Sequence, residues 1–294
     1  MVPHFTGREE ECNNVVAHVT NEATRLVSIW GSPGFGKTST AIAIGHRLQA
    51  QEGLPVYFIS LRGLRLKSDL TSRFLGLFTH SATTSQRLTA DDELFSILAE
   101  IANPFICIFD NADDLFESGL PDVKEEVVDL IGEILNRSDK VTFLLTTRES
   151  CQFLNLRFKG HHAVRIRELD EQSSLNLVQE LLPEANKSDC IKVRQICGSV
   201  PLAMKLLCSS ISEDNTATSS GSVDMFLNNT NNILEMLDNS DYPSNQRLKC
   251  LFDTSFQRLS VEEREALVSL CILPNHFDLH VALAVSGIKN NPGC

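Results

Sequence analysis

Apolar runs of strand length alternate with helix-like patterns along the first half of the chain. Five runs are apolar at consecutive rather than alternating positions, and they cover residues 25–30, 54–60, 104–110, 140–147 and 161–169. Between them, apolar residues recur at helical spacing, most clearly over residues 36–51, 90–103 and 123–138. Consecutive apolar strands interleaved with helices are typical of a parallel sheet that is covered on both faces. The pattern therefore predicts a doubly wound α/β domain over residues 1–168.

After residue 168 the strand pattern stops and shorter helical patterns follow. Pro and Gly separate three predicted helices, which cover residues 170–184, 188–198 and 201–211. A polar stretch rich in Ser and Thr, residues 212–222, predicts a loose linker. Near the end of the chain, Ser260 and Glu263 have the spacing of a capping box at the start of a helix. These patterns predict a helical domain over residues 169–237 and a third part over residues 238–294.

Composition limits the partners that the chain can have. Of its 294 residues, 42% are hydrophobic and 22% are charged, as in ordinary globular proteins, so each domain can bury a core. The net charge of −12 argues against general binding of nucleic acid, because a phosphate backbone attracts an excess of Lys and Arg. No apolar stretch approaches the roughly eighteen residues of a membrane span. We therefore expect neither a nucleic acid nor a membrane as partner.

Nine cysteines are scattered along the chain, and none of them forms a Cys-x-x-Cys pair. Several fall within apolar runs, and no apolar segment of the secretory type follows the first residues. We therefore expect reduced core cysteines and a cytoplasmic protein. The histidines lack the spacing of metal ligands and predict no metal site of their own.

The stretch GSPGFGKTS, Gly31 to Ser39, satisfies the phosphate-loop pattern G-x-x-x-x-G-K-[ST]. It lies between a predicted strand and a predicted helix, where the mechanism requires it, so a chance glycine turn is the weaker interpretation. In such a loop, backbone N–H groups surround phosphate oxygens at the positive end of the following helix. We expect these N–H groups to come from Gly34, Phe35, Gly36, Lys37, Thr38 and Ser39. Lys37 is expected to reach the β- and γ-phosphates, and Thr38 to place its hydroxyl on Mg²⁺.

Asp110 is predicted to complete the magnesium site. It follows the apolar residues of the third predicted strand, and the carboxyl end of a parallel strand lies on the ligand-binding edge of such a sheet. A turn residue that caps the strand is the alternative interpretation. Because a phosphate loop needs an acidic residue to hold the metal and its water shell, we expect Thr38 and Asp110 to be the magnesium ligands.

The residue after Asp110 bears on hydrolysis. A hydrolase with high turnover usually has a carboxylate there to activate the attacking water. This chain has Asn111, which can orient a water but cannot accept its proton. Asp113 and Asp114 lie nearby and are alternatives for that role, although both also suit the surface cap of a helix. The sequence therefore favours slow turnover.

Four further stretches carry a family resemblance. FTGREEE, from Phe5 to Glu11, looks like the motif hhGRExE, and LLTTRES carries the pattern T-T-R that ends in Arg148. CGSVPLAMKLL is similar to CGGLPLAL, with Pro201 at the position of the proline, and LVSLCILPNHFDL is similar to a winged-helix stretch. With the phosphate loop, this combination resembles the STAND class of P-loop NTPases and, within it, the NB-ARC proteins, nucleotide-operated switches of immune and cell-death signalling. The resemblance covers nearly the whole chain, and it implies that residues 169–237 are the first helical domain of such proteins and residues 238–294 part of a winged helix.

The resemblance implies roles for residues outside the phosphate loop. Arg148 is expected to contact the γ-phosphate, which ATP has and ADP lacks; a surface arginine paired with Glu149 is the alternative. Pro201 is expected to press its ring on the adenine and so attach the helical domain, although a proline also suits the first turn of a helix. Phe5 and Arg8 are expected to flank the base or the ribose. The catalytic set would then be Lys37, Asp110, Asn111 and Arg148.

Three departures from the family pattern bear on these roles. Family members usually carry Asp where this chain has Asn111, and Ser199 replaces the second glycine of CGGLPLA, a small change. The His-Asp motif that grips the β-phosphate is not visible, because His276 and His280 come too early and have other neighbours.

The predicted function is that of a molecular switch that binds ADP or ATP with Mg²⁺ and hydrolyses ATP slowly at most. ADP would hold the α/β and helical domains closed, and exchange for ATP would favour an open, self-associating state. An ATPase with sustained turnover and an interaction scaffold indifferent to nucleotide are the alternatives. The chain ends without a clear closing element, and no effector domain or repeat pattern is visible, so we expect a piece of a larger innate immune or cell-death protein.

Overall fold

The computed structural model describes residues 2–21, 23–78, 89–116, 121–213, 223, 256–257, 259–271 and 279–286. They belong to two units, residues 1–228 and residues 229–294. The first unit holds the α/β part together with the helices that follow it. The finer division into three domains remains a prediction.

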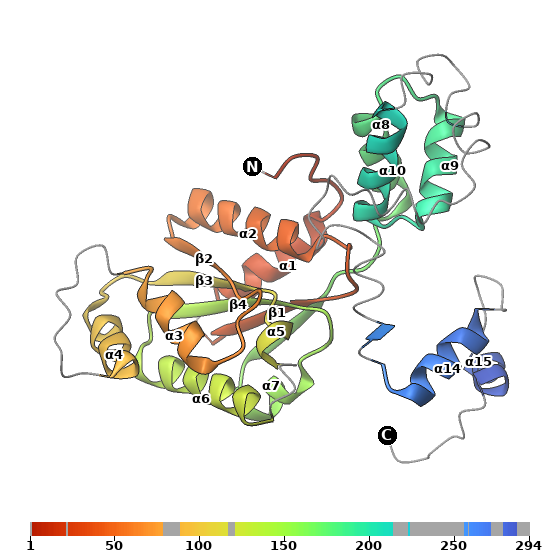
Figure 1. The fold of residues 1–294 in the computed structure, drawn as a ribbon. Helices are drawn as coiled ribbons and strands as arrows, with labels where there is room; N and C mark the ends of the chain where they lie inside the picture. Colours follow the sequence, from red (N-terminus) through yellow and green to blue (C-terminus); the bar gives the residue numbers. More distant parts are fainter. Residues whose placement is uncertain are drawn as a thin grey trace. The chain divides into compact units, whose positions relative to one another are not determined.

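Five strands form the sheet at the centre of the first unit (Figure 1): β1 (Leu26–Trp30), β2 (Val56–Ser60), β3 (Phe105–Asp110), β4 (Val141–Thr147) and β5 (His161–Arg165). Their order across the sheet is β2-β3-β4-β1-β5, and every neighbouring pair is parallel. Each strand lies inside one of the five apolar runs of the sequence. The predicted parallel sheet is therefore confirmed.

Helices cover both faces of the sheet. Successive side chains of a strand point to opposite faces, so each buried strand contributes to a core on either side. Along β3, Phe105, Cys107 and Phe109 belong to one core cluster, whereas Ile106 and Ile108 belong to another. The isoleucine face is covered by α1 (Glu9–Val19) and α2 (Lys37–Glu52). The phenylalanine face is covered by α3 (Lys67–Leu75), α4 (Ala90–Glu100), α5 (Asp113–Phe116), α6 (Pro121–Arg137) and α7 (Gln152–Arg157). This is the predicted doubly wound arrangement.

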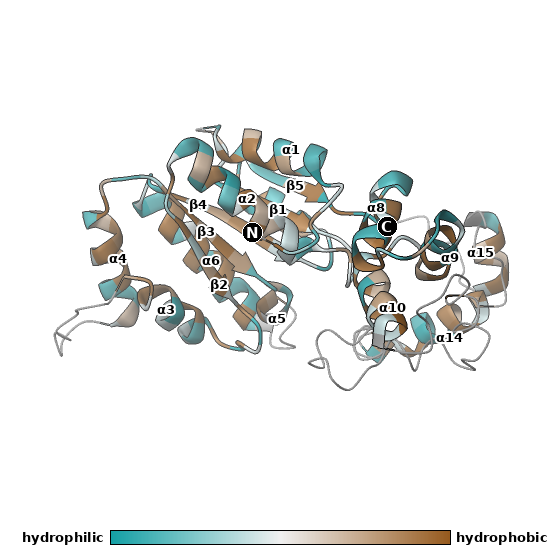
Figure 2. Cartoon of the chain, turned by 90° about the horizontal axis from the view of Figure 1, so that it is seen from above, coloured by the Kyte–Doolittle hydropathy of each residue, from teal (hydrophilic) through white to brown (hydrophobic). Residues whose placement is uncertain are grey.

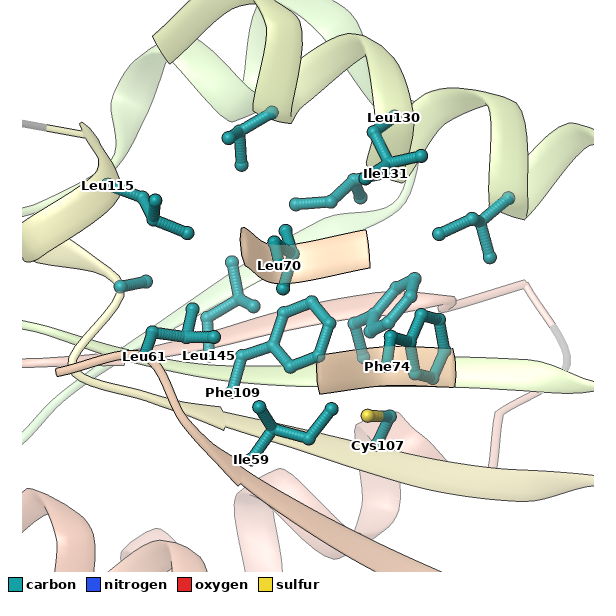
Figure 3. Close-up of a cluster of buried hydrophobic side chains, with 14 of the residues drawn as sticks. Ile59, Leu61, Leu70, Phe74, Cys107, Phe109, Leu115, Leu130, Ile131 and Leu145 are labelled. Atoms are coloured by element: carbon teal, nitrogen blue, oxygen red, sulfur yellow. The ribbon is translucent and has the colours of Figure 1, made fainter. Parts of the chain in front are cut away.

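Aromatic rings fill the core on the phenylalanine face. Phe109 of β3 meets Phe74 of α3 edge to face, with 5.8 Å between the ring centroids. Leu70 of α3 and Ile131 of α6 belong to the same cluster (Figure 3), and the strands beneath are mostly apolar (Figure 2). Each fully buried side chain of this size contributes about 1.5–3 kcal/mol. This packing fixes the strand ends that carry the polar residues of the site.

Among the described helices of the α/β part, four were not anticipated from the apolar pattern: α1, α3, α5 and α7. α1 buries Cys12, Val15 and Val19. These apolar residues do have helical spacing, but they are separated by mostly polar residues. In α3 one of the buried residues is Thr71, whose hydroxyl donates to Asp91 at 2.9 Å. α5 and α7 have four and six residues, which is too short for a helical period to be visible.

Three helices follow the sheet and pack against one another (Figure 1): α8 (Glu171–Leu181), α9 (Lys187–Cys197) and α10 (Pro201–Glu213). The side chains of Asp170 and Asn186 cap the first two helices by accepting from backbone N–H groups of the first turn. Gly198 ends α9 in a left-handed conformation. The three helices predicted after residue 168 are therefore confirmed.

The second unit is described only in part, with α14 (Val261–Leu270) and α15 (Leu279–Ser286). The predicted capping box is confirmed, because Ser260 Oγ accepts from the N–H of Glu263 and the Glu263 carboxylate accepts from the N–H of Ser260. Residues 272–278, which include His276 of the predicted winged-helix stretch, lie outside the described residues, as do residues 214–222 of the predicted linker. Within the described residues, no helix is long and apolar enough to cross a membrane.

Candidate functional site

The phosphate-loop stretch joins the end of β1 to the first turn of α2. Gly34 and Gly36 have φ angles of +81° and +90°, a conformation that residues with a side chain rarely adopt. Gly36 is the N-cap of α2 and offers no side-chain acceptor to the N–H groups of the first turn. These N–H groups and the positive end of the helix suit a bound anion.

The ammonium group of Lys37 lies against the loop that precedes it. Nζ donates to the carbonyl oxygen of Gly31 at 2.7 Å and to that of Ser32 at 3.1 Å. Burial lowers the pKa of Lys37 to about 8, an effect that nearby Asp113 opposes and Arg148 reinforces. A partly desolvated cation beside backbone N–H groups attracts phosphate more strongly than a solvated one does.

Thr38 and Asp110, the two predicted magnesium ligands, are in direct contact. Thr38 Oγ1 donates to Asp110 Oδ1 at 2.7 Å, across a sequence separation of 72 residues. Asp110 ends β3 and is 4% exposed. A hydroxyl and a carboxylate are oxygen donors of the kind that Mg²⁺ prefers, normally together with phosphate oxygens and water. Within the described residues, no cluster of three or more His, Cys, Asp and Glu side chains offers another metal site.

Thr146 of β4 also contacts Asp110, which the sequence did not indicate. Its Oγ1 donates to Asp110 Oδ1 at 2.6 Å and accepts from the N–H of Asn111 at 2.9 Å. The residue is 1% exposed. In the sequence, Thr146 stood out only as the first threonine of T-T-R. The role predicted from that pattern was that of Arg148, not of the threonine.

The segment after Asp110 is held in place by hydrogen bonds. Asn111 has a φ of +60°, which Asn tolerates better than most residues do, and its Nδ2 donates to Asp110 Oδ2 at 3.2 Å. Asp113, one alternative for a catalytic base, is 4% exposed and accepts from the N–H of Arg148 at 2.6 Å. Nothing is described of the side chain of Asp114, the other alternative.

Arg148 follows β4, which pairs directly with the strand that leads into the phosphate loop. Its Nε lies 4.0 Å from Asp113 Oδ2. Its Nη1 is buried and has no hydrogen-bond partner among the described residues. A buried donor without a partner costs about 1–3 kcal/mol, more when it is charged. A phosphate group would remove this cost, so the orphan donor fits an anionic ligand.

Arg8 is 4% exposed and joins three segments near the loop. Its Nη2 donates to the carbonyl oxygens of Phe35 at 3.1 Å and Arg167 at 2.6 Å, and its Nη1 pairs with Glu11 at 2.9 Å. These contacts fix the phosphate loop to the segment that follows β5. The predicted contact of Arg8 with a base or ribose remains a prediction.

Phe5 and Pro201 line the same pocket, beside Phe35 and Gly36 of the loop. The pocket has an empty volume of about 350 Å³, counting space open to solvent. Its mostly apolar walls suit a flat ring. Lys205, which the sequence analysis did not single out, also lines it and donates to the Pro3 carbonyl at 3.4 Å.

α10 touches the phosphate loop directly. The N–H of Leu202, in its first turn, donates to the carbonyl oxygen of Gly34 at 3.2 Å. A Cβ atom on Gly34 would lie 3.2 Å from Leu202 Cβ and 3.3 Å from Val200 Cγ1, so glycine also permits this close approach. The loop, the predicted magnesium ligands, Arg148 and the start of α10 thus gather at one edge of the sheet.

Residues 25–185 match the family model described as the NACHT domain. An uncharacterized WD repeat-containing protein of Nostoc sp. is 23% identical over 287 residues, which make up 91% of this chain and 22% of that protein. The chain thus spans about a fifth of the length of this relative.

Similar solved structures come from several organisms. The Orc1 protein of Aeropyrum pernix, in complex with DNA, has a TM-score of 0.57 and 12% identity, over 97% of this chain and 84% of that one. Domain III of the replication initiation protein DnaA of Thermotoga maritima has a TM-score of 0.52 and 14% identity, over 76% and 94%. A STAND protein with a tetratricopeptide repeat sensor from Pyrococcus horikoshii has a TM-score of 0.49 and 19% identity, over 98% and 38%. At these identities, the first two establish a shared fold and no more.

Proposed function

The chain belongs to the NACHT family, and from this premise we propose that it is a molecular switch whose conformation depends on bound ADP or ATP. Membership of this family of P-loop NTPases implies nucleotide binding. The proposal adds that the nucleotide controls how the α/β part and the helices α8 to α10 hold together. Mg²⁺ accompanies the nucleotide and supplies charge neutralisation between its phosphates.

The observation that carries the proposal is the direct contact between the phosphate loop and α10. The Leu202 N–H donates to the Gly34 carbonyl, and Pro201 lines the same pocket as Phe5 and Phe35. A nucleotide with its phosphates on the loop and its base in this pocket would touch both parts of the unit. A ligand shifts a conformational equilibrium only through such differential contacts.

The phosphate end offers a means to distinguish ATP from ADP. In the proposed complex, Lys37 binds the β- and γ-phosphates, while Thr38 and Asp110 hold Mg²⁺. The buried Nη1 of Arg148 then finds its partner in the γ-phosphate, which ADP lacks. The loss of this one charge-assisted contact on hydrolysis is the signal that the switch transmits.

Hydrolysis is proposed to be slow. Asn111 follows Asp110 where an active hydrolase has a carboxylate, and its amide donates to Asp110 instead of accepting a proton from water. Asp113 is buried, and its Oδ1 accepts from the backbone N–H of Arg148, so this oxygen is already engaged within the protein. An ATPase with sustained turnover is the competing function.

The binding test compares two lysine variants by isothermal titration calorimetry with ADP and ATP. We expect the unaltered protein to bind both nucleotides and Lys37→Ala to bind them about 10- to 100-fold more weakly, because a charge-assisted hydrogen bond is lost. Lys140→Ala is the control: Lys140 precedes β4 at the opposite edge of the sheet and pairs with Asp139. Absence of binding, or equal affinities in all three proteins, would contradict the proposal.

Phosphate release under excess ATP separates the switch from the ATPase. A switch retains its nucleotide and releases little phosphate beyond the first turnover. Continuous release that Asp110→Ala abolishes would favour the enzyme.

Self-association in the ATP state and a role in innate immune or cell-death signalling rest on the resemblance of the sequence motifs, and we propose them for the whole protein on that basis.

A further inference from the structure

Thr146 connects β4 to the end of β3 through three hydrogen bonds. Its hydroxyl donates to Asp110 Oδ1 at 2.6 Å and accepts from the Asn111 N–H at 2.9 Å. Its carbonyl oxygen accepts from the Ala112 N–H at 2.9 Å. Three successive residues at the end of β3 are therefore held by one buried threonine, whose hydroxyl uses its donor and one acceptor position.

These bonds determine which oxygen of Asp110 remains available. Oδ1 accepts from the hydroxyls of both Thr146 and Thr38, at 2.6 and 2.7 Å, so both of its lone pairs are engaged. The bond that Oδ2 makes in the described structure is the longer one from the Asn111 amide, at 3.2 Å. Oδ1 of the carboxylate is thus fixed by hydrogen bonds within the protein, whereas Oδ2 can accept further hydrogen bonds or bind a metal.

A magnesium site is sensitive to this kind of constraint. Mg²⁺ demands near-ideal octahedral geometry, so a carboxylate that can rotate serves it less well than a fixed one. Groups that orient a metal-binding side chain typically change metal affinity by about 10- to 100-fold when they are removed. Two hydroxyls therefore hold Asp110 Oδ1: that of Thr146, from the end of β4, and that of Thr38, from the first turn of α2.

We propose that Thr146 is a positioning residue for magnesium: it orients the Asp110 carboxylate and thereby sets the affinity of the protein–nucleotide complex for the metal. Because Arg148 lies two residues further along the same chain segment, the metal-holding carboxylate and the arginine at the γ-phosphate are connected through β4. This inference rests on the proposed function, since it requires a nucleotide at the phosphate loop.

Thr146→Val tests the role of the hydroxyl, because valine keeps the shape of threonine and loses its polar group. Two quantities are measured on the full chain: the affinity for ADP in EDTA, and the affinity of the protein–ADP complex for Mn²⁺, followed by electron paramagnetic resonance in place of Mg²⁺. We expect Thr146→Val to leave the first within about twofold and to lower the second by about 10- to 100-fold.

Two matched variants separate positioning from packing. Thr147→Val changes the next buried threonine of β4, whose hydroxyl donates to the Glu149 carbonyl and not to Asp110, and it should bind Mn²⁺ like the unaltered protein. Thr146→Ser keeps the hydroxyl and should restore most of the Mn²⁺ affinity. If Thr146→Val does not fold, Thr146→Cys replaces it, because a thiol has a similar size and is only a weak donor.

The outcomes distinguish this inference from the proposed function. If the unaltered protein binds ADP neither in EDTA nor with metal, the proposed function fails and takes this inference with it. If it binds both ligands, three results overturn the inference alone: unchanged Mn²⁺ affinity in Thr146→Val, equal loss in Thr147→Val, or no recovery in Thr146→Ser.

Discussion

At two single residues, a departure from the family pattern coincides with an unusual backbone conformation. Asn111 and Ser199 are both departures from the family pattern, and both adopt left-handed backbone, with φ angles of +60° and +59°. Asn is among the residues that tolerate this conformation, whereas serine in place of glycine costs about 1–2 kcal/mol. Serine differs from glycine by a small side chain, but at position 199 the left-handed backbone makes this difference cost conformational free energy.

The pKa of Lys37 makes nucleotide binding dependent on pH. In the free protein burial lowers this pKa to about 8, whereas phosphate favours the charged ammonium and raises it on binding. Below pH 8 both states are protonated and Lys37 adds no pH dependence. Above pH 8 the free protein loses the proton that the complex retains, so ADP affinity should fall, approaching tenfold per pH unit.

Calorimetry in two buffers of different ionisation enthalpy measures the proton that binding takes up. We expect most of one proton at pH 9 and almost none at pH 7, where Lys37 is already charged. An affinity for ADP that stays constant between pH 7 and pH 9.5 would show that Lys37 does not meet the phosphates.

Among the elements, the contact between the phosphate loop and α10 is the one on which the proposed switch depends. Each partner has a residue that suits its own local geometry: Pro201 starts α10, and Gly36 ends the loop and caps α2. Neither feature by itself indicates that the loop and α10 meet. They meet because the segment after β5 returns to the loop, where Leu169 donates to the Ser199 carbonyl and Arg8 bonds Phe35.

Gly34→Ala tests this contact, with Gly53→Ala as control. Both glycines have a positive φ, +81° and +65°, so both changes should cost about 1–2 kcal/mol of unfolding free energy. A Cβ on Gly53 meets no atom within 4 Å, whereas on Gly34 it presses on Leu202 and Val200. We expect Gly34→Ala to cost a further 1–3 kcal/mol, roughly, and to weaken ADP binding, while Gly53→Ala leaves ADP binding unchanged. Equal effects of the two changes in urea unfolding and in ADP titration would argue against the contact.

At the scale of the whole first unit, bound nucleotide should stabilise two regions that are distant in sequence. Amides of the first turn of α2 and of the first turn of α10 should both exchange more slowly with solvent when ADP is added, because the ligand orders the loop that both contact. Helix α4, which does not line the pocket, should be unaffected. Hydrogen exchange followed by mass spectrometry measures all three, and protection confined to α2 would show that the nucleotide does not reach the helices after the sheet.

Family membership confirms the STAND resemblance drawn from the motifs, at the level of the class that NACHT and NB-ARC proteins share. The narrower NB-ARC type, the signalling role and the division into three domains remain predictions. The DNA in the Orc1 structure belongs to that protein, and a likeness at 12% identity establishes the fold alone.

The sequence by itself determined the parallel sheet, the phosphate loop and the place of Asp110, because these depend on local order. A consecutive apolar run makes a buried strand, and the residue that ends it must lie at the sheet edge. Short helices such as α5 lacked a visible period, so the sequence did not determine them.

Only the tertiary structure decided the contacts across that edge. Thr146 bonds Asp110 because β4 lies between β3 and β1, an order that the sequence pattern does not specify. Leu202 reaches Gly34 and Arg8 reaches Phe35 because three separate segments converge on one loop. Hydrogen bonds between residues so distant along the chain leave no periodic signal, since they depend on how the elements pack and not on what any one of them contains.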